Sequence, residues 1–500
     1  MTTTPSASSF DPSRGRFESI VGILESEKAM YFPHTELETL LHAESNQLMR
    51  MLFQDHLELR ADREPRIQGI IDAQGIPRNS VEYNAKRTLT MRFGDVQVRR
   101  IAYRRHGHFP NLYPADAILN LPNEQYSLGL RRLVAEECIR GSFEGVVGAV
   151  ERETGVRLGK RQVEELTLRA AVDFESFYAK LPHSQAKPND VLVLSVDGKG
   201  INMLPDALRD ATAKTARSTV PSTKMSKAEE KPAHKRMAEV GVVYYATPVP
   251  RTPEDILSPR DKASGRAKPA PVAKNKWLTA SIVEDAATVI SQVFAESQRR
   301  DPEHSRTWVV LVDGNNHQIN CIRAEARKRK VKVHIVIDYI HVIGYVWGAA
   351  HSFFDYNDPR AKAWVEEKAA SILAGEAGLV AGAIKRKATC LKLSRAKREG
   401  ADKCNTYLKN KQPYLNYRLA LEQGWPIATG PIEGACRYLI KDRFDITGAR
   451  WGLGGAEAVL KLRALGKNDD FEGYWRYHIV QERRRIHEAR YAGGTIPGLT

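Results

Sequence analysis

The 500-residue sequence lacks any apolar run close to the ~18–20 residues that a helix needs to cross a bilayer. Its first residues, Met-Thr-Thr-Thr-Pro-Ser-Ala-Ser-Ser, also lack the charged start and apolar stretch of a signal peptide. We therefore expect a soluble, cytoplasmic protein with no membrane partner.

Cysteine is scarce as well, because the chain has five cysteines and no Cys-x-x-Cys pair. An odd, scattered set is typical neither of a disulfide framework nor of a structural zinc site, so we expect small buried side chains. The five are Cys138, Cys321, Cys390, Cys404 and Cys436.

Acidic residues are too few to balance the basic ones: 60 Asp and Glu stand against 76 Lys and Arg, which gives a net charge of +16. This excess favours a polyanionic partner, because cationic side chains release the counterions condensed on phosphates. Solubility alone or an acidic membrane surface would explain it too, and composition does not distinguish DNA from RNA. The hydrophobic fraction of 42% is high enough for packed cores, and the length indicates roughly three domains.

Residues 1–18 have the composition of a disordered lead, and apolar spacing then predicts helices in a region that extends over residues 19–123. Within it, apolar and polar residues alternate from Thr88 to Tyr103, which predicts a β-hairpin with its turn at Gly94–Asp95. We expect a mostly helical N-terminal region that contains this hairpin.

Residues 124–185 return to helical spacing, and the segment 142–166 has the rhythm of a helix-turn-helix. Its first helix would end near Gly155 and its second would begin near Gly159. A recognition helix presents its N-terminal residues to base edges, so the exposed start of the second helix would contact DNA. An ordinary helical hairpin with a solvated basic end explains the pattern equally well. The residues at that start are Lys160, Arg161 and Gln162.

Two continuous aliphatic runs, residues 191–196 and 307–312, each end in Val-Asp-Gly, at Asp197 and Asp313. Such runs are typical of strands buried on both faces of a sheet. An ionised aspartate is costly to bury, so its place at the exit of a strand favours a cleft. A strand-terminating turn explains either aspartate alone, and the two form a site only if the sheet brings them together.

The order and type of the remaining elements match an α/β, ribonuclease-H-like core whose first part is residues 186–341. In such a core the first and fourth strands lie adjacent and parallel. Two flexible basic loops, at about 205–237 and 249–276, interrupt the early strands. The other predicted elements are strands at 237–246, 276–282 and 331–337 and helices at 283–299 and 316–329.

A third carboxylate is expected on a later helix, where the segment 429–441 offers Glu433 in its first turn. Pro431 fits such a turn because its missing N–H costs nothing there. Arg437 and Lys441 would follow on the same face at steps of four, where DNA phosphate would meet metal. A favourable interaction with the helix dipole is the ordinary explanation for a glutamate at this position.

Four segments together resemble bacterial insertion-sequence transposases of the ISKra family, which are DDE enzymes distantly similar to the Mutator group. They read LSVDGKG, LVDGNNHQ, IDYIHVIGYVWGAA and GPIEGACRYLIKDRFDITGARWGLGGAEAVLKLRAL, and the resemblance extends over about residues 20–490. It implies a ribonuclease-H-like fold with an insertion before the glutamate, and catalytic, metal-binding roles for Asp197, Asp313 and Glu433. The segment Asp338-x-x-His341 matches a signature of related transposases in which the histidine lies near the scissile phosphate.

Independently of this resemblance, residues 342–425 are rich in Ala, Leu, Lys and Glu with helical periodicity, which predicts an all-α insertion. Its basic run at 385–398 fits a DNA-facing surface or a solvated helix face. The last part of the core, residues 426–500, would then contain the helix of Glu433 and a C-terminal basic helix.

The implied chemistry is phosphodiester hydrolysis followed by transesterification, in which two divalent ions about 3.5–4 Å apart serve the attacking and leaving oxygens. Oxygen-only ligands favour Mg²⁺ or Mn²⁺, two ions per active site, with Asp197 bridging them and Asp313 and Glu433 each completing one. The partners would be double-stranded DNA, as terminal inverted repeats and as target, and a second copy of the chain. We expect a homodimer or higher assembly on DNA, associated with the bacterial nucleoid.

The alternative to an enzyme is a catalytically silent, transposase-derived DNA-binding protein. An ATPase of related core is disfavoured because no glycine-rich phosphate loop accompanies the aspartates. Four further side chains are candidates for contacts with DNA. His341 would position phosphate or water unless it only packs beside a neighbouring tyrosine, and Trp451 would stack on a displaced base unless it belongs to the core. Arg443 and Arg450 would contact phosphates.

Overall fold

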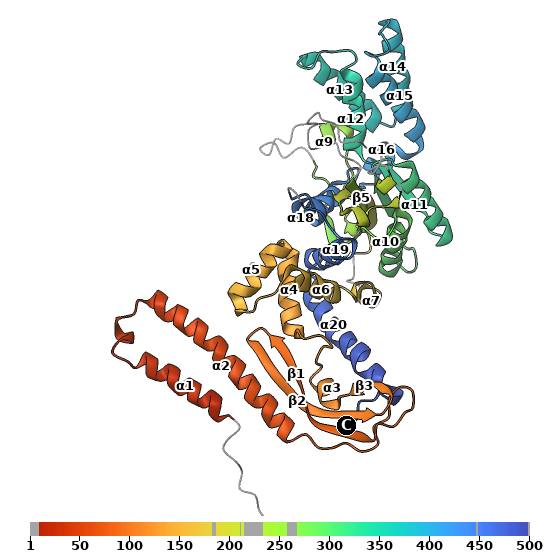
Figure 1. Cartoon of the computed structure of the whole chain (residues 1–500). Helices are drawn as coiled ribbons and strands as arrows, with labels where there is room; N and C mark the ends of the chain where they lie inside the picture. The colour runs from red at the N-terminus through yellow and green to blue at the C-terminus, as the bar shows by residue number, and fades with distance from the viewer. Residues whose placement is uncertain are drawn as a thin grey trace, which may run out of the picture. The chain divides into compact units, whose positions relative to one another are not determined.

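The computed structural model describes residues 10–182, 187–210, 212–214, 234–257, 268–446 and 449–498. By its internal contacts the chain divides into unit 1, Met1–Lys180 with Asp469–Thr500, and unit 2, Leu181–Asn468. The fold is mixed α/β, and the described residues form one sheet in each unit (Figure 1). None of the described helices is long and apolar enough to cross a membrane.

The sheet of unit 1 is antiparallel. The predicted hairpin is confirmed, but its turn is at Arg92–Phe93 and not at Gly94–Asp95, because Met91 already pairs with Gly94. Gly94 has φ 106°, a conformation that glycine adopts without strain. In spatial order the strands are β1 (Ser80–Met91), β2 (Gly94–Arg105) and β3 (His108–Leu112).

Two helices precede this sheet, and the second packs on β2. The first lies largely within the segment 1–18, so the prediction of a disordered lead is wrong from residue 11 onward; residues 1–9 lie outside the described residues. The Ser13 N–H donates to the Asp55 carboxylate at 3.1 Å, which ties the start of the first helix to the second. The two helices are α1 (Asp11–Leu24) and α2 (His34–Asp62).

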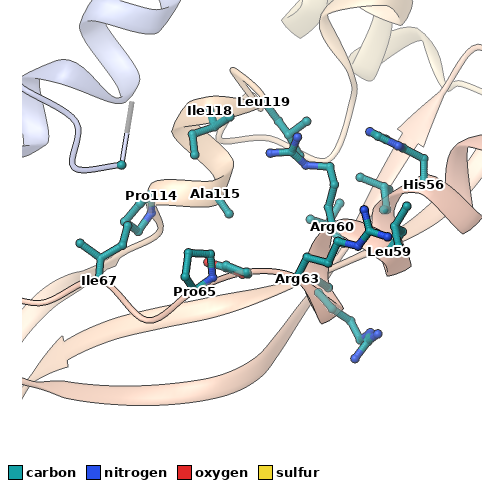
Figure 2. Close-up of a pocket in the computed structure, with 16 residues that line it drawn as sticks. His56, Leu59, Arg60, Arg63, Pro65, Ile67, Pro114, Ala115, Ile118 and Leu119 are labelled. Atoms are coloured by element: carbon teal, nitrogen blue, oxygen red, sulfur yellow. The ribbon is translucent and has the colours of Figure 1, made fainter. Parts of the chain in front are cut away.

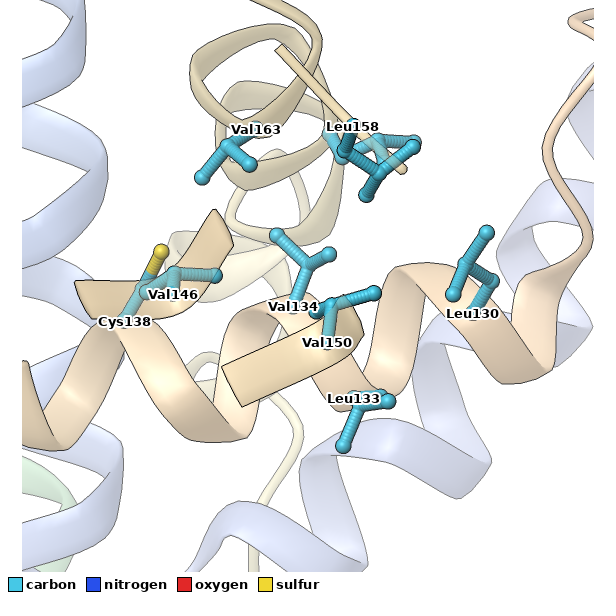
Figure 3. Close-up of a cluster of buried hydrophobic side chains, with 9 residues drawn as sticks. Leu130, Leu133, Val134, Cys138, Val146, Val150, Leu158 and Val163 are labelled. Carbon is cyan, nitrogen blue, oxygen red and sulfur yellow. The ribbon is translucent and has the colours of Figure 1, made fainter. Parts of the chain in front are cut away.

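Three helices of unit 1 pack around one buried core: α4 (Leu128–Arg140), α5 (Phe143–Thr154) and α6 (Lys160–Ala170). The predicted boundaries are confirmed, because α5 ends at Gly155, whose φ is 71°, and α6 begins directly after Gly159. Figure 3 shows aliphatic side chains from all three helices pointing toward one another. The buried residues are Leu130, Leu133, Val134, Cys138, Val146, Val150, Leu158, Val163 and Leu166.

The C-terminal basic helix α20 (Phe471–Ile486) belongs to unit 1, so its predicted place in the core, within residues 426–500, is wrong. Its His478 Nδ1 lies 2.7 Å from the Asp173 carboxylate, and its Glu482 accepts a hydrogen bond at 2.8 Å from Arg131 of α4. These buried polar contacts join residues that lie far apart in the sequence, and they hold α20 within unit 1.

Unit 2 contains a mixed sheet in the order β6-β5-β4-β7-β8. β4 and β6 are antiparallel to β5, whereas β4, β7 and β8 run parallel, so the predicted adjacency of the first and fourth strands is confirmed. The strands are β4 (Val191–Asn202), β5 (Lys235–Ala246), β6 (Ala273–Ser281), β7 (Trp308–Val312) and β8 (Val333–Ile337).

Helices α10 (Ala286–Arg300) and α11 (Asn316–Lys328) precede β7 and β8, as predicted. α10 lies directly against β5, because a Cβ at Gly241 would come within 2.4 Å of a methyl group of Val293. The described ends of the two predicted loops contain the short helices η2 (Pro205–Ala207) and α9 (Pro253–Leu257). The middle parts of both loops lie outside the described residues.

Residues 342–425 are all described, and as predicted they are helical, with none of them in a strand. Their helices are α12 (Tyr339–Ala350), α13 (Pro359–Leu373), α14 (Ala377–Cys390), α15 (Glu399–Lys411) and α16 (Tyr417–Glu422). After them the chain returns to the sheet through α17 (Gly430–Ala435), the π-helix η5 (Cys436–Lys441), α18 (Asp442–Phe444) and α19 (Leu453–Lys467).

Candidate active site

Two aspartates lie at one edge of the unit 2 sheet. Asp313 directly follows β7, and on the parallel strand β4 the last residue that pairs with β7 is Ser195, two positions before Asp197. β4 then continues along β5 to Asn202, so the prediction that this strand ends at Asp197 is wrong. The Val-Asp-Gly motif marks the point where β4 loses its partner β7. Both aspartates lie at the same edge of the sheet and are partly buried.

The carboxylate of Asp197 is partly buried and has two donors. The Gly198 N–H lies 2.7 Å from its Oδ1, and the Cys436 thiol lies 3.5 Å from its Oδ2. Burial raises the pKa of Asp197 and the charge of Asp313 raises it further, although the two donors act in the opposite direction. The carboxylate is therefore held in one orientation and resists ionisation. Cys436 is buried, as predicted for all five cysteines, whereas Cys390 is exposed and Cys321 is only partly buried. The contact of Cys436 with a carboxylate was not predicted.

Glu239 is a further carboxylate that the sequence did not point to. It lies on β5 directly opposite Gly198, and a Cβ added at that glycine would come within 3.3 Å of Glu239 Oε2. This oxygen is buried and has no hydrogen-bond partner within the described part of the chain. Burial raises the pKa of Glu239, and the charge of Asp197 adds to the effect. The strand register alone reveals the neighbour, so no sequence signal could have found it.

Asp313 is held by the turn that follows β7. The Asn315 N–H donates to its Oδ1 at 2.8 Å, and the Tyr407 hydroxyl donates to its carbonyl oxygen at 3.0 Å. Gly314 is required between them, because its φ is 99° and an added Cβ would lie 2.5 Å from the Tyr407 hydroxyl. Tyr407 belongs to α15, so the helical segment reaches the edge of the sheet beside the second aspartate.

Glu433 is exposed at the start of α17 and is connected to the same edge through Thr429 and Asp338. The Asp338 N–H donates to the last carbonyl of β7 at 2.8 Å. The Thr429 hydroxyl lies 2.8 Å from Asp338 Oδ2 and 3.3 Å from Glu433 Oε1, and its single proton serves one of them at a time. Three residues after Glu433, Cys436 contacts Asp197. One short helix thus links the third predicted carboxylate to the first.

His341 and Glu433 line a common cavity of about 500 Å³. His341 is exposed on α12, and its ring centroid lies 5.5 Å from that of Tyr345 and 6.0 Å from that of Tyr407. The packing beside Tyr345 that the sequence left open is therefore present. It does not bury the imidazole, which remains available to a ligand in the cavity.

The predicted site residues lie in two groups, Asp197 with Asp313 and Glu433 with His341. Within the described ranges, no three His, Cys, Asp or Glu side chains are close enough to hold one metal ion as they stand. The donor set fits a hard cation, because Asp197, Asp313 and Glu433 offer only carboxylate oxygens.

Arg437 and Lys441 are exposed on the helix that follows Glu433. The expected alignment of the three side chains at steps of four is wrong, because residues 436–441 form a π-helix. A π-helix has i→i+5 hydrogen bonds, so its side chains rotate away from the face that an α-helix would give them. Arg450 is also exposed.

Two of the residues expected to contact DNA are buried. Trp451 packs against Phe444, with 4.4 Å between the ring centroids, and the Arg443 guanidinium lies 4.5 Å from the centroid of the same indole. Trp451 also forms a β-bridge with Met203. The exposures of Arg443 and Trp451 are 3% and 6%, so base stacking by the tryptophan and phosphate contact by the arginine are wrong predictions. The core explanation for Trp451 holds.

Lys160 and Arg161, at the start of α6 in unit 1, are exposed, and Gln162 is partly exposed. Lys160 forms an ion pair with Glu144, and Arg161 forms one with Glu165 at 3.1 Å. Exposed pairs of this kind contribute little, so both cations can exchange their carboxylate partners for phosphate.

Unit 1 contains a separate cavity of about 350 Å³ between α2, β2 and α3 (Pro114–Ile118). Figure 2 shows that Arg60 and Arg63 line this cavity together with apolar side chains such as Ile67 and Ile118. Its acidic residue, Glu64, accepts a hydrogen bond from the Ile101 N–H at 2.9 Å. The lining offers no pair of carboxylates for acid–base or metal chemistry.

No protein-family model matches the chain, and no curated protein is detectably similar to it. The functional assignment therefore depends on the residues and geometry of the sheet edge.

Proposed function

We propose that this protein is a DDE-type DNA transposase with a ribonuclease-H-like core. The observation that carries the proposal is the parallel pairing of β4 with β7, which puts Asp197 and Asp313 at one edge of the sheet. The order β6-β5-β4-β7-β8, with three antiparallel strands followed by two parallel ones, supports the same core. Glu433 lies 433 − 313 = 120 positions after Asp313, and the helices α12 to α16 occupy most of this interval as an insertion.

Asp197, Asp313 and Glu433 would hold the divalent ions, Mg²⁺ or Mn²⁺. When bound, such ions supply an activated oxygen nucleophile and stabilise the leaving oxygen of the phosphodiester. The protein itself orients the carboxylates: Gly198 and Cys436 hold the first, and the turn at Asn315 holds the second. Glu433 is exposed and contacts only Thr429 through its carboxylate in the described part of the chain, so it is free to move toward an ion.

The direct test is cleavage of end-labelled DNA that carries the sequences flanking this reading frame, with Mg²⁺ or Mn²⁺ present. We expect the wild type to cleave one strand at an inverted repeat. Asp313→Asn should lower the cleavage rate by roughly a thousandfold or more, because several kcal/mol of transition-state stabilisation disappear. Asp355→Asn, an exposed aspartate after α12, is the matched control and should cut normally.

Cleavage that survives Asp313→Asn would rule out the carboxylate mechanism. Specific binding of the flanking DNA without any cutting would instead support the catalytically silent DNA-binding protein. Joining of two DNA ends requires at least two active sites in one assembly, so the proposal includes a homodimer or larger complex on DNA, measurable by light scattering of the DNA-bound protein.

We also propose that the start of α6 contacts DNA, because Lys160 and Arg161 are exposed at the entrance of the second helix of a helix-turn-helix-like bundle. Replacing both by alanine should weaken binding and reduce the slope of log K against log salt by about 2, roughly one for each phosphate contact. Arg140→Ala, exposed at the end of α4, is the control. An unchanged slope in the double variant would leave the bundle as an ordinary structural element.

A further inference from the structure

The groove between α12 and α15 contains three glycines with different surroundings. At Gly400 the helices touch through bare backbone, since an added Cβ would lie 2.1 Å from the Gly348 carbonyl oxygen. At Gly344, one turn closer to the start of α12, an added Cβ would meet nothing within 4 Å. The two helices lie side by side (Figure 1), and the groove opens beside Gly344, in the cavity that Glu433 and His341 also line.

The lining of this groove combines an apolar, aromatic surface with one lysine and with the carboxylates of Asp338 and Glu433. Ile340 is 62% exposed, an unusual state for a large aliphatic side chain in a helix. Tyr345 is stacked on Tyr407 with 3.9 Å between the ring centroids and 16° between the planes, so its ring is rigidly held. Lys403 supplies the cation, and its partner Glu399 is an exposed residue on the same helix at 2.7 Å. Such an exposed ion pair is weak, so a phosphate can replace Glu399 as the partner of Lys403.

We propose that this groove binds one unpaired nucleotide of the DNA strand next to the scissile phosphate, its base against Tyr345 and Ile340 and its phosphate beside Lys403. This inference rests on the proposed transposase function, because it assigns part of the substrate to the same site. An aromatic surface next to a cation is the combination that single-stranded nucleic acid requires. A cavity of about 500 Å³ is the size of a small-molecule site and admits one nucleotide, whereas a base pair inside a duplex cannot enter it.

Gly344 allows the groove to be filled without disturbing the fold. Gly344→Leu puts a side chain into open space, whereas Gly344→Ala adds a single carbon there. The alanine variant should melt about 2 °C higher than the wild type, because glycine inside a helix is destabilising. Gly22→Leu is the matched control: this glycine of α1 also has nothing within 4 Å of an added Cβ, but it lies in unit 1.

The probe is a single-stranded octanucleotide of thymidines with one central 2-aminopurine, added to the full chain without divalent ions so that nothing is cut. Wild type and Gly22→Leu should quench the 2-aminopurine as it stacks. Gly344→Leu should need at least tenfold more protein for the same quenching, at an unchanged or higher melting temperature. Equal quenching by Gly344→Leu, or none by the wild type, would overturn the proposal.

The same variants in the cleavage assay separate the two proposals. If the wild type cuts flanking DNA and Gly344→Leu cuts equally well, the groove proposal fails and the transposase proposal stands. If the wild type quenches the probe, Gly344→Leu does not, and no protein cuts, the groove remains a single-strand site and the enzymatic proposal fails.

Discussion

Replacing Asp197 by asparagine should raise the melting temperature of the metal-free protein while abolishing DNA cleavage. Burial and the charge of Asp313 raise the pKa of Asp197 in the folded chain above its unfolded value. The folded state therefore binds the proton more tightly, and stability is lost as the pH rises from the unfolded pKa through the raised folded one. Above the raised folded pKa this loss is complete. Asparagine cannot ionise, so the variant avoids it.

Two measurements check this prediction. In a thermal melt without divalent ions, the advantage of Asp197→Asn should shrink as the pH is lowered through the raised pKa, where the wild type becomes protonated. With added Mg²⁺ the order should reverse, because an ion that binds only the folded wild type stabilises it by mass action. Asp355→Asn should match the wild type in both. A lower melting temperature for Asp197→Asn at neutral pH without metal would mean that the ionised carboxylate supports the fold.

Much of the unit 2 sheet could be predicted because its strands are continuous aliphatic runs. All five residues of β7 are buried, which is the burial that such a run indicates for a central parallel strand. The place of Asp313 after this strand could therefore be predicted from the sequence. The sequence also predicted Asp197 at this edge, but it did not predict that the strand continues beyond Asp197. The residues after it continue as a strand because they pair with β5, and that pairing depends on a segment about 40 positions away.

The neighbours of the candidate carboxylates could not be predicted, because they depend on tertiary register. Glu239 faces Gly198 only through the pairing of β4 with β5, and Cys436 reaches Asp197 only because its helix packs over β4. The burial of Trp451 has the same origin: its β-bridge with Met203 joins segments that lie far apart in the sequence. Local patterns correctly predicted a helix at Glu433, but they did not predict that the helix continues as the π-helix η5.

Replacing Arg131 by methionine should give the largest loss of stability in unit 1. The Arg131 side chain is fully buried and forms ion pairs with Glu124 and, at 2.8 Å, with Glu482 of α20. Methionine fills similar space but leaves two largely buried carboxylates without this cation. Removing one partner of a buried ion pair costs about 3–5 kcal/mol. We expect the lower part of this range, because Glu482 keeps its second partner, Arg485.

Hydrogen exchange of the amides in α4 and α20 measures this loss where it arises. The matched control is the next residue: Arg132 pairs with Glu136 and Glu472, but its side chain is 33% exposed. Arg132→Met should therefore cost at most about 1 kcal/mol. Equal protection in the two variants would show that burial of the Arg131 network adds nothing to the stability of unit 1.

The same network predicts how unit 1 responds to acid. Burial opposes ionisation of Asp173, but hydrogen bonds from His478 and Arg485 outweigh it and hold the pKa of Asp173 at about 2. A lowered carboxylate pKa contributes stability above the unfolded value of about 3.9, and that contribution is lost as the pH falls toward 2. In the wild type, the amides of α20 should therefore lose their protection from hydrogen exchange as the pH falls from about 3.9 toward 2. In Arg131→Met this loss should occur at a higher pH, because unit 1 has less stability to lose before α20 is released.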